Sequence, residues 1–196
     1  MEGLMRLKAM AKINLGLDVL GKREDGYHEV RMIMQTIRMY DILDIRKTRR
    51  PGIVLTTNLP FIPTDQRNLV YKAAQMLMEE FDVEEGLSIK LRKFIPVAAG
   101  MAGGSSDAAA AFVGVNRMFH LGLTEEQLME RAVKVGADVP YCIMRGTALA
   151  EGIGEKLTRL PEVPKCYVLI GKPGINVSTK TAYENLNLEG IGKHPD

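Results

Sequence analysis

Alternating apolar and polar positions predict that the first third of the chain is mostly strand. Residues 7–20 alternate between apolar and other residues, with large aliphatic side chains at Ile13, Leu15, Leu17 and Val19. The polar turn GKREDG follows at residues 21–26, so we expect a hairpin. Runs rich in β-branched or alternating residues predict further strands at 30–38, 42–48 and 53–57, with Asp41 separating the first two.

The pattern then changes to helical spacing. After Asn68, apolar side chains recur every three or four residues as far as Phe81, which predicts an amphipathic helix. Residues 86–92 read as a strand, and a second helix is expected from 108 to 119, before Gly122. Thr124 and Gln127 form a capping-box pattern for a third helix that ends by Gly136.

Shorter elements and a predicted domain boundary complete the pattern in the last third of the chain. A helical piece begins at residues 138–140, and strands are expected at 147–151 and 167–170. The segment 160–165 contains Pro161 and Pro164 and is the best candidate for a domain boundary. We therefore expect one unit over residues 1–160 and the start of a second over 161–196.

The stretch PVAAGMAGGSSDAAAA at residues 96–111 carries the most distinctive chemistry. Gly100, Gly103 and Gly104 let the backbone approach a ligand and adopt positive φ, while residues 105–107 supply helix-capping side chains. A glycine loop that opens a helix presents free N–H groups and the positive end of the helix dipole, which suits phosphate. A tight turn into a small-residue packing helix is the alternative interpretation.

Composition narrows the class of protein further. The chain has 26 basic and 24 acidic side chains and a net charge of +2, so no basic patch for nucleic acid is evident. Cys142 and Cys166 are far apart and there are three histidines, which supports neither a disulfide framework nor a zinc site. No apolar run reaches the length of a membrane span. We expect a cytoplasmic protein that acts on small anionic molecules, with no membrane or nucleic-acid partner.

Four stretches in order resemble the kinases of the galactokinase, homoserine, mevalonate and phosphomevalonate (GHMP) superfamily. They are AKINLGLDVLGKREDGYHEV at 11–30, the glycine-rich stretch at 96–111, GADVPYCIMRGTALAEGIGE at 136–155 and KPGINVSTKTAY at 172–183. Within the superfamily they are most similar to enzymes that phosphorylate a cytidine-diphosphate-linked sugar alcohol in the non-mevalonate route to isoprenoids. The resemblance implies an α+β fold, a twisted mixed sheet backed by helices, followed by the start of a ferredoxin-like domain.

The resemblance also gives roles to two charged residues whose local pattern has simpler interpretations. Lys12 lies mid-strand, where a lysine is usually solvated, and Asp138 stands where it could cap the following helix. In the resembling enzymes the lysine offsets charge that develops on the transferred phosphoryl group, and the aspartate is the catalytic base. Both residues are therefore candidate catalytic residues.

Ligand contacts are implied at further positions, with ATP and Mg²⁺ as the expected nucleotide and metal. No trio of carboxylates marks the metal ligands. The residues implied to bind ATP are Asn68, Pro96, Ala98, Gly100, Ala102, Gly103, Gly104, Ser105 and Ser106. The residues implied to bind the acceptor substrate are Asn14, Tyr27, His28, Thr179 and Tyr183, with Tyr27 and Tyr183 expected on either side of the cytosine ring and Thr179 near the diphosphate.

One difference from the superfamily's sequence pattern leaves other functions open. The third glycine-rich motif of the superfamily has no counterpart in residues 1–196, so we expect ATP binding to be better preserved than acceptor turnover. The alternatives are another kinase of the superfamily, acting on a mevalonate-type or sugar substrate, and a catalytically impaired nucleotide-binding remnant. A dinucleotide-binding domain is disfavoured because GMAGGSS lacks the GxGxxG spacing.

Overall fold

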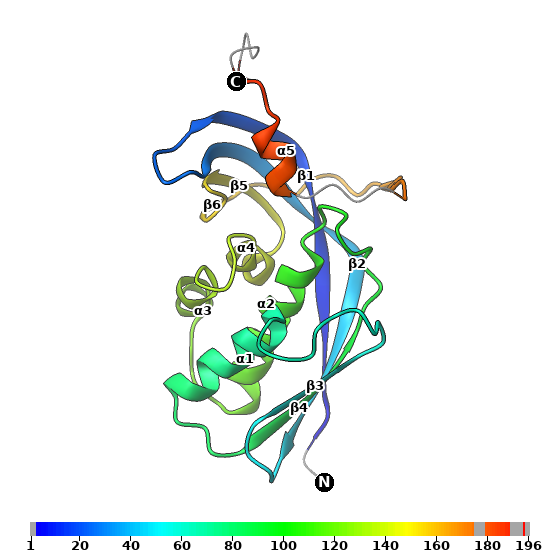
Figure 1. The fold of residues 1–196 in the computed structure, drawn as a ribbon, viewed down its shortest axis with the longest axis vertical. Helices are drawn as coiled ribbons and strands as arrows, with labels where there is room; N and C mark the ends of the chain where they lie inside the picture. Colours follow the sequence, from blue (N-terminus) through cyan, green and yellow to red (C-terminus); the bar gives the residue numbers. More distant parts are fainter. Residues whose placement is uncertain (1–2, 175–178, 189–193, 195–196) are drawn as a thin grey trace.

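A mixed sheet covered on one face by helices forms the body of the protein (Figure 1). The computed structural model describes residues 3–174, 179–188 and 194. The strands are β1 (Met5–Lys22), β2 (His28–Thr48), β3 (Ile53–Thr57), β4 (Gly86–Arg92), β5 (Thr147–Gly152) and β6 (Lys156–Arg159). The helices are α1 (Leu69–Glu80), α2 (Gly103–Met118), α3 (Glu125–Ala132), α4 (Val139–Met144) and α5 (Thr179–Glu184).

The long strand β2 organises the sheet because it changes partners along one edge. β1 pairs antiparallel with β2 along nearly its whole length, and on the other edge β4 pairs with residues 42–48 and β5 with residues 30–35. Between Gln35 and Ile42 this edge of β2 pairs with no strand in the described parts of the chain. The segments that lead out of β4 and into β5 therefore diverge at the same level of the sheet.

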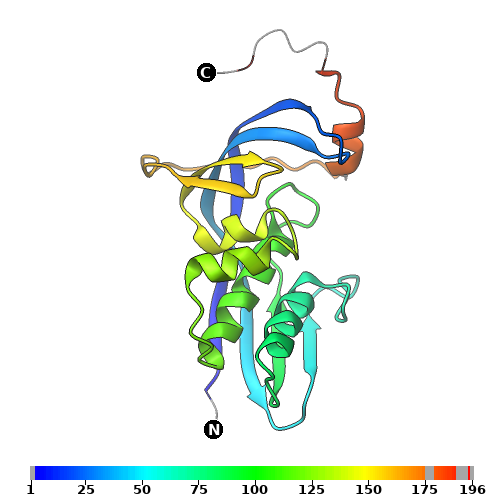
Figure 2. The same cartoon turned by 90° about the vertical axis from the view of Figure 1, so that its left-hand side faces the viewer.

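The apolar core lies between the sheet and the paired helices α1 and α2, which pack against each other (Figure 2). Its largest buried side chains include Phe112, Leu43, Ile45 and Leu77. Gly114 brings α2 close to the sheet, because a Cβ there would lie 2.5 Å from Ile45 Cδ1 and 2.7 Å from Leu7 Cδ1. None of the helices in the described ranges is long and apolar enough to cross a membrane.

Much of the predicted element order is confirmed, including the α+β class. The helix after Asn68, the strand 86–92, the capping box of Thr124 and Gln127 and the strand near residue 147 are all present. The two strands expected on either side of Asp41 are one continuous strand, because the Asp41 carboxylate is buried and accepts backbone hydrogen bonds instead of ending the strand.

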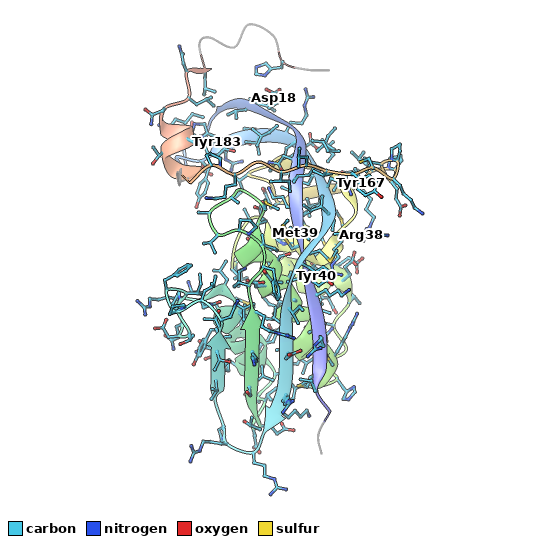
Figure 3. All side chains as sticks on the ribbon, turned by 90° about the vertical axis from the view of Figure 1, so that its right-hand side faces the viewer. Asp18, Arg38, Met39, Tyr40, Tyr167 and Tyr183 are labelled. Carbon is cyan, nitrogen blue, oxygen red and sulfur yellow. The ribbon has the colours of Figure 1, made fainter. Side chains whose placement is uncertain are left out.

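The strand predicted at residues 167–170 is wrong in this structure. Tyr167 and Leu169 are fully exposed, in a segment without strand pairing that runs along the open face of β1 and β2 (Figure 3). A strand forms only where its backbone groups find a partner strand, and apolar alternation alone does not supply one. Strand β6, with a mostly exposed burial pattern, was not expected from the sequence.

Replacing Gly114 by valine tests the close approach of α2 to the sheet. We expect Gly114→Val to lower the free energy of unfolding by about 2 kcal/mol, because the larger side chain overpacks the contact with Ile45 and Leu7. Chemical denaturation measures the change. The matched control is Gly16→Val in β1, where a Cβ meets nothing within 4 Å. Equal stability of the two variants would contradict this account of the packing.

Candidate active site

The glycine-rich loop leaves the sheet beside the open edge of β2. Its backbone reaches positive φ at Ala98 (54°), Gly100 (70°) and Ala102 (53°). Ala102 is the residue that precedes the first turn of α2, and it makes no side-chain capping bond. The predicted capping role of Ser105, Ser106 and Asp107 is therefore wrong, since the helix begins earlier, at Gly103, and these three residues lie inside it.

Gly103 is needed for close approach and not for an unusual backbone angle. A Cβ at this position would lie 3.2 Å from Lys93 Nζ and 3.2 Å from Ile95 Cγ2. Gly104 has ordinary room, because its nearest neighbour would be Leu69 Cδ1 at 3.8 Å. Glycine at 103 thus lets the start of α2 rest directly on the segment that follows β4.

A cavity of about 320 Å³ lies between this loop, the start of α1 and the end of β4. Free N–H groups at the start of α2 adjoin it, which is the arrangement that suits an anionic ligand. The residues that were predicted to bind ATP and that line the cavity are Asn68, Pro96, Ala98, Gly100, Ala102, Gly103 and Gly104.

The side chains of Asn68 and Ser106 make hydrogen bonds that fix the segments around the cavity. Asn68 Oδ1 accepts from Val70 N at 2.9 Å, which caps α1, and its Nδ2 donates to Pro63 O at 2.7 Å. The hydroxyl of Ser106 donates to the carbonyl of Met10 and so ties α2 to β1. Neither Ser105 nor Ser106 lines the cavity, so the structure does not group them with the other predicted ATP-binding residues.

Lys12 and Asp138 come together although they are far apart in sequence. Lys12 Nζ lies 3.6 Å from Asp138 Oδ2 and donates to Asn14 Oδ1 at 3.0 Å. Lys12 is 5% exposed, so the solvated-strand interpretation of this lysine is wrong. Asp138 makes no side-chain capping bond to α4, which leaves its partly exposed carboxylate available for other contacts.

Lys12 is also joined to the glycine-rich loop. Its backbone N–H donates to Met101 O at 3.2 Å, at a point where the pairing of β1 with β2 shifts register between Met10 and Lys12. Below the loop, Ala11, Ile95 and Met101 form a small buried cluster separate from the main core. The Lys12–Asp138 pair and the cavity are therefore two parts of one connected region.

A buried tyrosine fixes α4 against the sheet. Tyr141 Oη donates to Gly146 O at 2.7 Å and lies 3.0 Å from Thr36 Oγ1, and Gly146 N donates to the same hydroxyl at 3.1 Å. Burial raises the pKa of Tyr141 to about 12, so it stays a hydrogen-bond donor at neutral pH. Because Thr36 pairs with Lys12, this network links α4 to the strand that carries the lysine.

Two of the predicted acceptor-binding residues, Tyr27 and His28, lie at the tip of the β1–β2 hairpin, and Tyr183 of α5 reaches this tip (Figure 3). Asn14 lies farther along β1, beside Lys12. His28 and Tyr183 stack with ring centroids 4.9 Å apart, so His28 covers one face of the Tyr183 ring. Tyr27 is 60% exposed. Burial, and then the charge of Asp138, raise the pKa of Tyr183. Thr179 is the first residue of α5, and its side chain lies outside the described part of the structure.

The sequence analysis did not single out a buried charged group below the loop, formed by Lys93, Asp41 and Asp107. Lys93 and Asp107 line the cavity, and burial raises the pKa of Asp107 well above its usual range while the charge of Lys93 opposes that shift. In the sequence these three residues are visible only as charged side chains within otherwise apolar stretches. Local patterns assign such side chains to turns and helix caps.

The described residues do not form a protein-built metal cage. No group of three His, Cys, Asp or Glu side chains that could hold a metal ion occurs among them. Mg²⁺ commonly keeps several waters and binds through substrate phosphates with one or two carboxylates. A metal carried by the phosphates of a nucleotide needs no cage of protein side chains.

Comparison with known proteins gives the family. Residues 68–146 match the model of the GHMP kinases N terminal domain. The chain is 56% identical over 192 residues to the 4-diphosphocytidyl-2-C-methyl-D-erythritol kinase of Lachnospira eligens, which covers 98% of this chain and 67% of that protein. The chain belongs to the 4-diphosphocytidyl-2-C-methyl-D-erythritol kinase family of GHMP kinases. A kinase of the same name from Lachnoclostridium phytofermentans is 57% identical over 98% of this chain.

Solved structures agree with this family and its fold. A crystal structure of 4-(cytidine 5'-diphospho)-2C-methyl-D-erythritol kinase superposes with a TM-score of 0.79 at 32% identity, over 94% of this chain and 65% of that one. A homoserine kinase from Cytophaga hutchinsonii shares the fold at 19% identity and a TM-score of 0.74, over 96% of this chain and 61% of that one. The chain spans about two thirds of the length of the kinases it matches.

The two cysteines of this family member should differ strongly in reactivity. Burial raises the pKa of the Cys142 thiol to about 12, whereas Cys166 is exposed. Since the thiolate is the reactive form, we expect Cys166 to react with a thiol reagent at pH 8 at least about 100-fold faster than Cys142. Absorbance after mixing with a chromogenic disulfide measures both phases, and Cys166→Ser should remove the fast one. Two equally fast phases would contradict the burial of Cys142.

Proposed function

We propose that the protein transfers the γ-phosphate of ATP to a hydroxyl of 4-diphosphocytidyl-2-C-methyl-D-erythritol, in the non-mevalonate route to isoprenoid precursors. The observation that carries this proposal is the buried Lys12 facing Asp138 at 3.6 Å, joined by its own backbone to a loop with phosphate-binding geometry. The relatives at 50% to 57% identity bear the name of this kinase, which supports the choice of substrate.

The two charged residues would divide the chemistry. Asp138 orients the acceptor hydroxyl and takes its proton, while Lys12 offsets the negative charge that grows on the phosphoryl oxygens. The hydrogen bond from Lys12 to Asn14 and the ion pair with Asp138 hold the ammonium in place before the substrate arrives. Such preorganisation is the main lever in phosphoryl transfer, where the protein forms no covalent bond.

The glycine-rich loop would bind the phosphates, and the cavity beside Asn68 the rest of the nucleotide. Mg²⁺ would enter with ATP and supply charge neutralisation between its phosphates. His28, Tyr183 and Asn14 would contact the acceptor. We place the reaction in the cytoplasm, where ATP is available.

Two alternatives make different predictions in one experiment. A different GHMP kinase is favoured by the shared fold with homoserine kinase, and an impaired nucleotide-binding remnant by the exposed segment around Tyr167. ADP release is measured with the cytidyl substrate, homoserine, mevalonate and galactose in parallel, alongside ATP titration by calorimetry. We expect measurable ATP binding and slow turnover, with the cytidyl substrate alone among the four acceptors. Turnover of another acceptor would overturn the substrate assignment, and ATP binding without any turnover would support the remnant.

Substitution of the charged pair tests the division of labour. Asp138→Asn should lower turnover by a factor of about 100 or more with little loss of stability, because Asp138 makes no capping bond. Lys12→Met should lower turnover similarly and change ATP affinity less. Lys8→Met is the control, since Lys8 lies on the same strand with its ammonium over the Tyr40 ring. Wild-type turnover in Lys12→Met or Asp138→Asn would remove that residue from the chemistry.

A further inference from the structure

A buried lysine lies beneath the glycine-rich loop between two aspartates. Lys93 Nζ donates to Asp107 Oδ2 at 2.5 Å and to Asp41 Oδ2. The side chains of Lys93, Asp41 and Asp107 are 5%, 0% and 3% exposed. Charges removed from water this completely are tolerated when each has a close partner, so breaking the contact has a large effect.

These side chains connect the segments that build the cavity. Asp41 Oδ1, in the open edge of β2, accepts from the backbone N–H groups of Phe94 and Ile95 at 2.5 and 2.8 Å. Asn58 binds the backbone of Lys93 through two hydrogen bonds, of 2.7 and 3.1 Å. The ammonium of Lys93 is thereby held at a fixed place relative to both β2 and the segment that follows β4.

The start of α2 rests on this fixed ammonium. Asp107 reaches it from the second turn of the helix, and Gly103 approaches it so closely that a Cβ would lie 3.2 Å from Lys93 Nζ. We propose that Lys93 and Asp107 are positioning residues for the nucleotide site, because their contact holds the start of α2, and with it loop 96–102, in the phosphate-binding arrangement. The proposal rests on the function proposed above only for the identity of the ligand, ATP.

One oxygen of Asp107 carries this contact. Oδ2 accepts from Lys93, whereas Oδ1 is buried and has no hydrogen-bond partner among the described residues. An amide nitrogen placed at Oδ1 would therefore break no existing hydrogen bond. Asp107→Asn keeps the acceptor for Lys93, and Asp107→Ala removes it while adding a residue of high helix propensity to an alanine-rich helix.

Two backbone amides report whether the loop is in place without any ligand. Lys12 N donates to Met101 O at 3.2 Å, and Ser106 N donates to Ala102 O at 2.8 Å. Hydrogen exchange of these amides, followed by NMR on the ligand-free chain, measures opening of the loop and the first turn. Amides in α1, which the contact does not touch, provide the internal reference.

In Asp107→Ala we expect the two amides to exchange about tenfold faster and the dissociation constant for ATP to rise about tenfold, since a hydrogen bond to a charged group is lost. Asp107→Asn should stay within about threefold of wild type in both measurements. Saturating ATP should restore most of kcat in both variants. The control Leu128→Ala creates a cavity in α3 and should lower stability without changing either amide or ATP affinity.

The outcomes separate this proposal from the proposed function. Wild-type exchange at both amides in Asp107→Ala, or an Asn variant as impaired as the Ala variant, would overturn the positioning role. If Asp107→Ala does not fold, Asp107→Leu removes the same acceptor while filling the space. Exchange changes without turnover of the cytidyl substrate would sustain the positioning role and count against the function.

Discussion

The open edge of β2 is the constraint on which the rest of the structure depends. Between Gln35 and Ile42 this edge pairs with no strand in the described parts of the chain, so loop segments can contact β2 there. Thr36 N donates to Gly146 O and Thr36 Oγ1 accepts from Gly146 N, while the Asp41 carboxylate accepts from the backbone of the segment after β4. These bonds bring the start of the glycine-rich loop and the end of α4 to one level of the sheet, where Lys12 lies on the neighbouring strand.

The two groups of paired charges in this region differ in whether solvent can reach them. The Lys93 group is enclosed and internally paired, so it is suited to holding backbone in place. Lys12 is equally buried, but its partner Asp138 is 32% exposed at the side chain, which leaves one end of the pair open to a ligand. The same residue types thus serve two purposes, and the difference lies in which partner can be reached from solvent.

Sequence reasoning was strongest where a local pattern decides the structure. The capping box of Thr124 and Gln127 is a local hydrogen-bonding signal, and it is confirmed. The pairing of Lys12 with Asp138 spans 126 positions and followed from the family resemblance, since periodicity placed Lys12 in solvent. Asp41 and Lys93 were missed because a buried ion pair between distant segments leaves no periodic trace. The stack of His28 on Tyr183 depends on tertiary contact in the same way.

The small apolar cluster under the loop has a consequence for how the molecule fluctuates. Ala11, Ile95 and Met101 are buried apart from the main core, and the loop that covers them contains two alanines with left-handed backbone. A unit with few buried contacts of its own opens at lower free energy than the whole domain. The loop over this cluster can therefore open at a lower free energy than the main core unfolds. A substitution that weakens this cluster would first make the chain sensitive to proteases near residues 96–102. A lower melting temperature would appear only after larger changes.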